Sequence, residues 1–178
     1  EDLDVKLGGG IVVAHDAAQM RLIEEKAKIE AAVGIETHIL NRFELRRKAP
    51  YLSEDALGGG FCAGEGKANP LRVTPAIVRA AGAAGATLYR ETPVFDLSGK
   101  AGKFSIETPR GTFRADKVIN TAGAKAADVA AMLGMKIELS GFPLQVSVTE
   151  PIAPLIPHLV YSAAGKLSLK QATNGGCI

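Results

Sequence analysis

The chain has 178 residues, of which 47% are hydrophobic and 22% are charged, and its formal net charge is +2. This is the composition of an ordinary globular protein of one domain or slightly more. The longest basic run covers only residues 46–48, so the clustered basic face of a nucleic-acid-binding protein is not expected. No apolar run approaches the roughly 20 residues that cross a bilayer.

The two cysteines and the two ends of the chain lead to expectations about the cellular compartment of the protein and about whether the chain is part of a longer protein. The acidic start, EDLDVKLGGG, lacks a signal-peptide core. Cys62 and Cys177 lie far apart in the sequence. Free thiols in a reducing, cytoplasmic environment are therefore expected, with a disulfide as the alternative. Because the chain opens without Met and closes on an apolar residue after NGG, we expect it to be a piece of a longer protein.

The first predicted elements are a strand and a helix. Residues 8–14 (GGGIVVA) predict a glycine turn that leads into a short apolar strand. Asp16 is a typical helix cap, and apolar side chains recur at helical spacing over residues 17–34. Gly34 is expected to end this helix.

Two shorter helices are predicted next, separated by a loop. One begins at Asn41 and ends before Pro50. Residues 51–68 are too rich in glycine for more than turns and one short strand. The Asn-Pro pair at 69–70 then combines a cap with a proline at the first helical position, although the Thr-Pro pair at 74–75 could begin the same helix.

From residue 86 onward, strand candidates dominate. ETPRGTF, at 107–113, predicts a hairpin, and an alanine-rich helix is expected over 124–134. This order predicts an α+β fold with a mixed, largely antiparallel sheet flanked by helices, and one βαβ-like patch over 86–137. The strand candidates are residues 86–97, 103–108, 112–121, 136–139, 144–149, 158–162, 166–171 and 175–178.

Motifs for several kinds of chemistry are missing. His15, His38 and His158 have no second ligand at helical or hairpin spacing, so no metal site is expected. The chain has neither the GxSxG of serine hydrolases nor the GxxxxGK[ST] of a phosphate-binding loop. The glycine clusters at 8–10, 58–60 and 64–66 each lack the third glycine of GxGxxG, and all three are expected to be turns. No acid–base pair is evident, and the catalytic residues remain unknown.

The stretch KVINTAGA, residues 117–124, combines an expected buried strand end with very small residues. Small residues at the carboxyl end of a strand allow a ligand to approach the backbone. A tight turn packed on the following helix is the alternative explanation.

Three segments in order resemble a known family. They are GKANPLRVTPAIVRAAGAAGATLYRETPV (66–94), FSIETPRGTFRADKVINTAGA (104–124) and GFPLQVSV (141–148). Together with the opening stretch 7–52, they resemble the FAD-dependent amine and amino-acid oxidases, a family that includes D-amino-acid oxidase, glycine oxidase and the sarcosine oxidase beta subunit. The amino-terminal GxGxxG of that family is absent here.

The resemblance implies a domain organisation. Residues 1–70 would be helices and loops of the substrate domain, 71–140 an inserted part of the FAD-binding domain, and 141–178 the start of the substrate-domain sheet. Without the GxGxxG, this chain alone is expected to bind FAD weakly or not at all.

The resemblance also implies site residues. Val94 would contact the adenine of FAD through its main chain, while Thr121, Ala122 and Gly123 would lie against the dinucleotide. Family members often have an aromatic residue where this chain has Lys125, and the chain contains no tryptophan. The polar candidates for contact with substrate are Gln145, Tyr161, Lys170 and Gln171. Lys170 could hold a substrate carboxylate, or could point outward from a strand.

The function implied is oxidation of the C–N bond of a small amino acid or N-methyl amine, such as sarcosine, glycine or an opine, with hydride transfer to FAD. Partner subunits of a hetero-oligomeric oxidase are possible. One alternative is an FAD-dependent relative that oxidises a 2-hydroxy acid or glycerol phosphate. Others are a catalytically silent substrate or subunit-contact domain, and a pure binding module.

Overall fold

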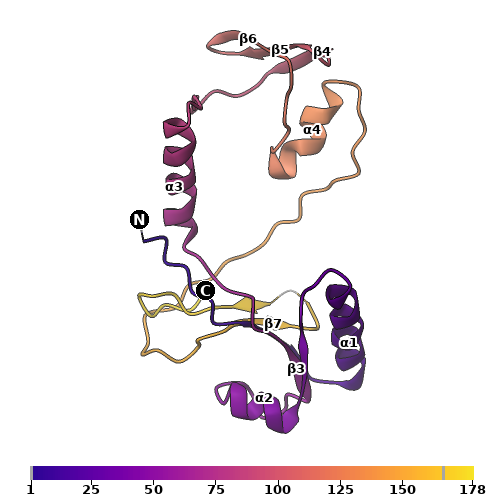
Figure 1. Ribbon diagram of the computed structural model, residues 1–178, viewed down its shortest axis with the longest axis vertical. Helices are drawn as coiled ribbons and strands as arrows, with labels where there is room; N and C mark the ends of the chain where they lie inside the picture. Colours follow the sequence, from indigo (N-terminus) through magenta and orange to yellow (C-terminus); the bar gives the residue numbers. More distant parts are fainter. Residues whose placement is uncertain (1, 166) are drawn as a thin grey trace. The chain divides into compact units, whose positions relative to one another are not determined.

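A computed structural model describes residues 2–165 and 167–178, and the chain forms two compact units. Unit 1 comprises residues 1–81 and 146–178, and unit 2 comprises residues 82–145. The elements can be followed in chain order in Figure 1. They are β1 (Gly10–Ala14), α1 (Ala17–Ala31), β2 (His38–Asn41), α2 (Arg42–Lys48), β3 (Gly58–Cys62), α3 (Pro70–Ala83), β4 (Asp96–Lys100), β5 (Lys103–Thr108), β6 (Gly111–Ala115), the short 3-10 helix η1 (Gly123–Lys125), α4 (Ala126–Ala131), β7 (Leu159–Ser162) and β8 (Ser168–Leu169).

Unit 1 is built on a five-stranded sheet with strand order β2-β3-β1-β7-β8. The central strand β1 pairs antiparallel with β3 and parallel with β7, where Val12 lies opposite Tyr161. The β2–β3 and β7–β8 pairs are antiparallel. The predicted mixed, largely antiparallel sheet with flanking helices is therefore confirmed.

The helix starts follow from side-chain caps that the sequence predicts. Asp16 accepts a hydrogen bond from the backbone N–H of Gln19 at 2.8 Å and begins α1. Asn41 and Glu44 form a capping box at the start of α2, each side chain bonding the other's backbone. At α3, Asn69 Oδ1 accepts from the N–H of Leu71, so the entry lies at 69–70 rather than at 74–75.

Three glycines of β3 let two helices approach the sheet from opposite faces. On one face, a Cβ at Gly60 would lie 2.7 Å from Cγ2 of Ile23, and a Cβ at Gly58 would lie 3.0 Å from Sδ of Met20, both in α1. On the other face, a Cβ at Gly59 would overlap the backbone oxygen of Val12, and Leu45 of α2 lies 3.6 Å away. The expectation that residues 58–60 form a turn is thus wrong. Their missing side chains make room for packing on both faces of a strand.

The hydrophobic core lies on the α2 face of this sheet. Ile11 is fully buried, and Leu45 and Ala49 of the α2 region are almost so. Segments distant in the sequence complete the cluster through Ile156, Val160 and Cys177. Cys62 and Cys177 are both free thiols.

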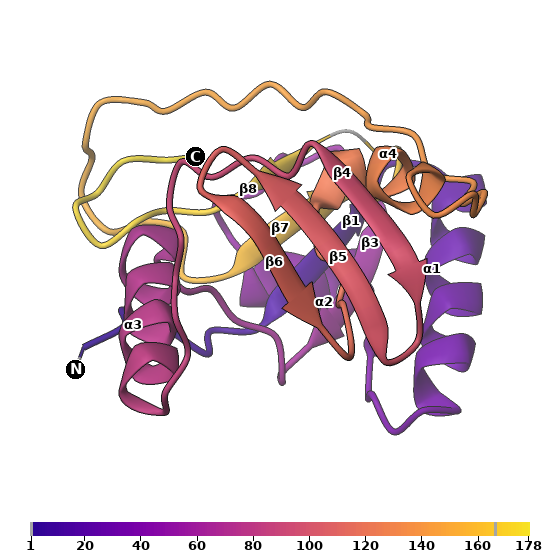
Figure 2. The same ribbon diagram turned by 90° about the horizontal axis from the view of Figure 1, so that it is seen from above.

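Unit 2 contains a three-stranded antiparallel meander, β4-β5-β6, which Figure 2 shows as neighbouring arrows. Thr108 pairs with Gly111 across the predicted hairpin. The alanine-rich helix is present as η1 followed by α4.

Several strand predictions in and beside unit 2 are wrong. Residues 86–95, 116–121 and 136–139 are not in strands, and no parallel pair forms over 86–137, so the βαβ-like patch is absent there. Ile119 of the KVINTAGA stretch is 85% exposed, and residues 117–121 pair with no strand of the described chain. A strand forms only where a neighbouring backbone accepts and donates its hydrogen bonds.

The last predicted strands have mixed outcomes. Residues 144–149 are not in a strand, and 175–178 contribute only an isolated bridge, Gln171–Cys177. The candidate 166–171 reduces to β8, and its first residue lies outside the described part of the chain. In the described part of the chain, no helix is both long and apolar enough to cross a membrane.

Candidate functional site

The first candidate for a ligand site is a cavity of about 350 Å³ beside β7 in unit 1. Its polar lining residues are Tyr161, Glu65, Lys26 and Ser162, and Val12 and Ile23 are among its apolar ones. A Cβ at Gly10 would overlap the Glu65 carboxylate, so this glycine allows the carboxylate to lie over the central strand. Partial burial, the charge of the nearby Glu65 carboxylate and a hydrogen bond with that carboxylate raise the pKa of Tyr161, which keeps its hydroxyl protonated.

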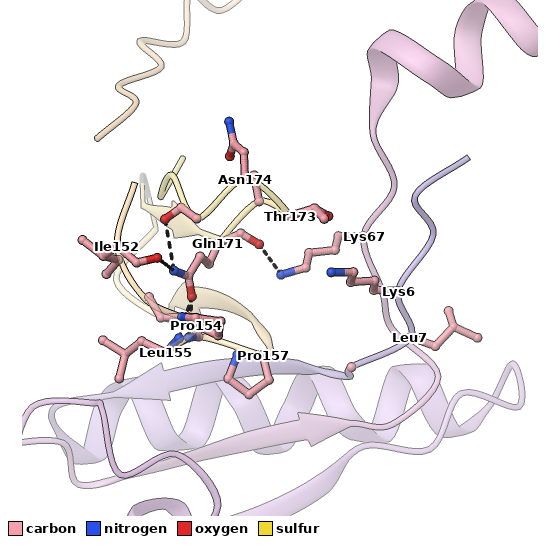
Figure 3. Close-up of a pocket in the computed structure, with 14 residues that line it drawn as sticks. Lys6, Leu7, Lys67, Ile152, Pro154, Leu155, Pro157, Gln171, Thr173 and Asn174 are labelled. Carbon is pink, nitrogen blue, oxygen red and sulfur yellow. Dashed lines mark hydrogen bonds between the residues drawn. The ribbon is translucent and has the colours of Figure 1, made fainter. Parts of the chain in front are cut away.

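The second candidate is a larger cavity of about 760 Å³, also in unit 1. Figure 3 shows Gln171 at its wall, with Lys6 and Lys67 on one side and residues 152–157 on another. This cavity and the one beside β7 share no lining residue.

The side-chain amide of Gln171, a predicted substrate residue, forms all of its hydrogen bonds with backbone groups. Its Oε1 accepts from the N–H groups of Leu155 (2.7 Å) and Ile156 (3.0 Å). Its Nε2 donates to the carbonyl oxygens of three residues, Ile152, Ala153 and Gly175, at 3.0–3.2 Å. The side chain is only 5% exposed, so it fixes the walls of the larger cavity and has little capacity left for a ligand.

The other predicted substrate residues are not gathered with Gln171. Tyr161 lines the smaller cavity, and Lys170 is half-buried, with its backbone paired to Ile178. Gln145 is exposed and is the last residue of unit 2. The four residues therefore do not form one cluster in unit 1.

The predicted FAD residues all lie in unit 2 and are exposed. Val94 is 40% exposed and precedes β4, and Thr121, Ala122 and Gly123 form the turn into η1. Asn120 supports this turn, because its Oδ1 accepts from the N–H of Ala122 (3.2 Å) and its Nδ2 donates to the carbonyl of Ala126 (2.8 Å).

The turn at 121–123 leaves room beside its backbone. A Cβ at Gly123 would meet no heavy atom within 4 Å, so packing on the following helix does not explain this glycine. Its φ of +57° does, since that region of backbone space favours glycine. That a dinucleotide lies against this turn stays a prediction.

A buried polar pair was missed from the sequence. Tyr51 Oη lies 2.7 Å from Nδ1 of His158, a residue that is 8% exposed. The rings of Phe61 and His158 pack edge to face. The Lys48 ammonium lies 3.7 Å from the centroid of the Phe61 ring. No sequence signal pointed to this pair, because its members are 107 positions apart. Among the described residues, no group of three or more His, Cys, Asp or Glu side chains could hold a metal ion.

A family model described as FAD dependent oxidoreductase matches residues 1–170. The chain belongs to this family. It is 32% identical over 146 residues to glycine oxidase of Geobacillus kaustophilus, covering 80% of this chain and 38% of that protein. Human mitochondrial dimethylglycine dehydrogenase is 30% identical over 156 residues, with 82% and 18% covered. The sarcosine oxidase subunit beta of Rhizobium meliloti is 24% identical over 176 residues, with 96% and 42% covered.

The fold of this FAD-dependent oxidoreductase chain agrees with that assignment. The crystal structure of glycine oxidase from Geobacillus kaustophilus matches with a TM-score of 0.79 at 24% identity, over 99% of this chain and 47% of that one. The chain thus spans less than half the length of each of these relatives.

Proposed function

We propose that the complete protein oxidises the C–N bond of a small amino acid or an N-methylated amino acid with FAD as its cofactor. The match of residues 1–170 to the FAD-dependent oxidoreductase family supports this function most strongly. The names of its relatives refer to glycine, dimethylglycine and sarcosine, which are all small amino acids that carry a carboxylate.

In this proposal, the residues of unit 2 hold the cofactor. The main chain of Val94 contacts the adenine, and Thr121, Ala122 and Gly123 lie against the dinucleotide. The open surroundings of Gly123 support this assignment. When bound, FAD supplies the hydride acceptor, so this chain contributes binding, orientation and exclusion of water.

Unit 1 contributes to the substrate site in this proposal. Tyr161 is the strongest of the four candidates, because it lines a cavity and keeps its proton through the raised pKa of its hydroxyl. Its hydroxyl is hydrogen-bonded to the Glu65 carboxylate, so the phenol oxygen and that carboxylate are placed to accept hydrogen bonds from the amino group of a substrate. Lys170 does not line this cavity and stays a prediction. Gln171 acts on the shape of the neighbouring cavity, and Gln145 stays a prediction.

Partner subunits also belong to the proposal. The R. meliloti relative is called subunit beta, so the complete protein is proposed to work beside other subunits. We further propose that the 178-residue chain alone holds FAD weakly or not at all, since it contains no GxGxxG. We also propose a cytoplasmic location, because both cysteines are free thiols, as expected in a reducing compartment.

The test uses the complete protein, purified with its flavin. Its visible flavin absorbance is recorded without oxygen, and then after addition of sarcosine, dimethylglycine or glycine. Bleaching by one of them is the expected result. Flavin that bleaches only with a 2-hydroxy acid or glycerol phosphate would instead favour the other oxidation, and a protein without flavin would overturn the proposal.

A further inference from the structure

The larger cavity of unit 1 is built from segments that are far apart in the sequence. A Cβ at Gly8 would overlap the carbonyl oxygen of Pro157, so the two segments touch through backbone. At another wall, a Cβ at Gly175, whose φ is +92°, would lie 2.6 Å from the carbonyl oxygen of Ile152. The five hydrogen bonds of Gln171 tie the same segments together, so the walls are held firmly by the fold.

Two lysines are fixed side by side at this cavity. Lys6 and Lys67 form an antiparallel bridge, with each backbone N–H donating to the other residue's carbonyl at 2.8 and 2.9 Å. Residues directly opposite in an antiparallel pair project to the same face, with Cβ atoms about 5 Å apart. Figure 3 shows both ammonium groups pointing the same way, toward the segment that contains Gln171.

Like charges placed directly opposite each other destabilise a strand pair. Lys67 is also half-buried and donates from Nζ to the Gln171 carbonyl at 2.5 Å. Loss of hydration and the nearby charges of Lys6 and Lys170 lower the pKa of Lys67. The bridge thus concentrates positive charge at a cost to the stability of the fold.

No carboxylate forms an ion pair with Lys6 or Lys67 among the described residues. The cavity lining contains Lys6 and Lys67 but no Asp or Glu. Asp4 is the nearby acid that interacts electrostatically with both lysines, yet its Oδ1 accepts a hydrogen bond from Thr173 at 2.6 Å and it lies outside the cavity lining. An anion from solution can therefore approach both ammonium groups.

We propose that this cavity binds a small molecule with about two negative charges, either a phosphate monoester or a dicarboxylate, whose oxyanion lies between Lys6 and Lys67. Two lysines match a phosphate monoester, which carries roughly −2 near neutral pH. The apolar part of the ligand lies against Leu155 and Pro157 of the opposite wall. A volume of about 760 Å³ accommodates a molecule of this kind. This site does not depend on the proposed oxidation and shares no lining residue with the Tyr161 cavity.

The complete protein is titrated by calorimetry with phenyl phosphate, phenylsuccinate and phenylacetate. These probes share a ring, and only the first two carry two negative charges. Both dianions are expected to bind at least about tenfold more tightly than phenylacetate, because only they pair with both ammonium groups. Binding of phenyl phosphate alone would identify a phosphate site, and binding of both dianions a general dianion site. Equal affinity for all three probes would overturn the proposal.

Substitutions locate the binding. Lys6→Gln and Lys67→Gln should each weaken phenyl phosphate binding about tenfold, whereas Lys28→Gln on the exposed part of α1 should leave it unchanged. Lys6 is exposed, so its replacement keeps the test valid even if Lys67→Gln perturbs the Gln171 contact. Unchanged affinity in Lys6→Gln contradicts the assignment.

A charge reversal separates binding from stability. Lys6→Glu places a carboxylate opposite Lys67, which should raise the thermal unfolding midpoint while abolishing binding of phenyl phosphate. If Lys6 and Lys67 were only solvated surface lysines, phenyl phosphate would not bind the unaltered protein at this cavity, and Lys6→Glu would change its stability alone. Retained binding in this variant would overturn the proposal.

Discussion

Tyr51 and His158 form a hydrogen-bonded pair inside unit 1, with 2.7 Å between Oη and Nδ1. Burial, which acts most strongly, and the positive charges of Lys48 and Lys67 lower the pKa of His158 below its usual 6.5. Burial also raises the pKa of Tyr51 to about 12. Both rings are therefore neutral at neutral pH.

This pair predicts a loss of stability in mild acid. As the pH falls below about 6.5, His158 takes up a proton in the unfolded chain but not in the folded one, so the free energy of unfolding decreases until the lowered folded pKa is reached. Urea unfolding midpoints measured across this range should fall less steeply for His158→Asn than for the unaltered chain. His38→Asn, at an exposed histidine, serves as the control, and parallel curves for all three would contradict the prediction.

A second prediction concerns the five backbone bonds of Gln171. In Gln171→Glu, one carboxylate oxygen still accepts from Leu155 and Ile156, but the other faces the carbonyl oxygens that Nε2 now bonds. The substitution should lower the free energy of unfolding by about 3 kcal/mol at neutral pH. The loss should shrink in acid, where a protonated carboxyl can donate one hydrogen bond.

Urea unfolding at two pH values measures this effect. Gln145→Glu makes the same chemical change at an exposed position and should alter stability little. A Gln171→Glu chain as stable as the control would show that these hydrogen bonds do not hold the cavity walls.

The helices were predictable because their signals are local. Asp16 and Asn41 cap helices through bonds to backbone groups two or three residues away, so sequence spacing alone identifies them. The family assignment was likewise recoverable, since it rests on the order of motifs along the chain.

The missed features all depend on distant partners. Ile119 and Val146 follow strand-like patterns, but a pattern does not supply the neighbouring backbone that a strand requires. Tyr51 meets His158, and Lys6 meets Lys67, only after the sheet has formed. Glycine runs are ambiguous in the sequence for the same reason. Gly59 lies in a strand because the backbone of Val12 and the side chain of Leu45 pack closely around it.

A third prediction follows from the exposed apolar segment at 142–148. Phe142, Leu144, Val146 and Val148 alternate along it and are 66–80% exposed. Unpaired backbone with such side chains is a template for pairing with another chain. The 178-residue chain should therefore self-associate as its concentration rises.

Light scattering of the 178-residue chain against concentration tests this expectation. The double variant Leu144→Lys/Val146→Lys should shift association to several-fold higher concentration, because charge opposes strand pairing. Phe43→Lys removes a side chain that is 84% exposed on α2 and should have a smaller effect. Equal effects of the two changes would indicate general surface hydrophobicity instead.

The last prediction compares two glycines of unit 2 with the same backbone demand. Gly123 and Gly134 have φ values of +57° and +70°, and a Cβ at either would meet no heavy atom within 4 Å. Substitution by alanine should therefore introduce a similar conformational strain at both positions, of about 1 kcal/mol. Only Gly123 belongs to the turn proposed to lie against FAD.

In the complete protein, Gly123→Ala should weaken FAD binding about tenfold or more, while Gly134→Ala should leave it near that of the unaltered protein. Flavin retained after dialysis, and flavin fluorescence during titration of the apoprotein, measure the difference. Thermal unfolding of both apoproteins should show matched losses, which removes strain as the explanation. Equal flavin affinity in the two variants would place the dinucleotide away from residues 121–123, because a methyl group at Gly123 fills the space that the cofactor is proposed to use.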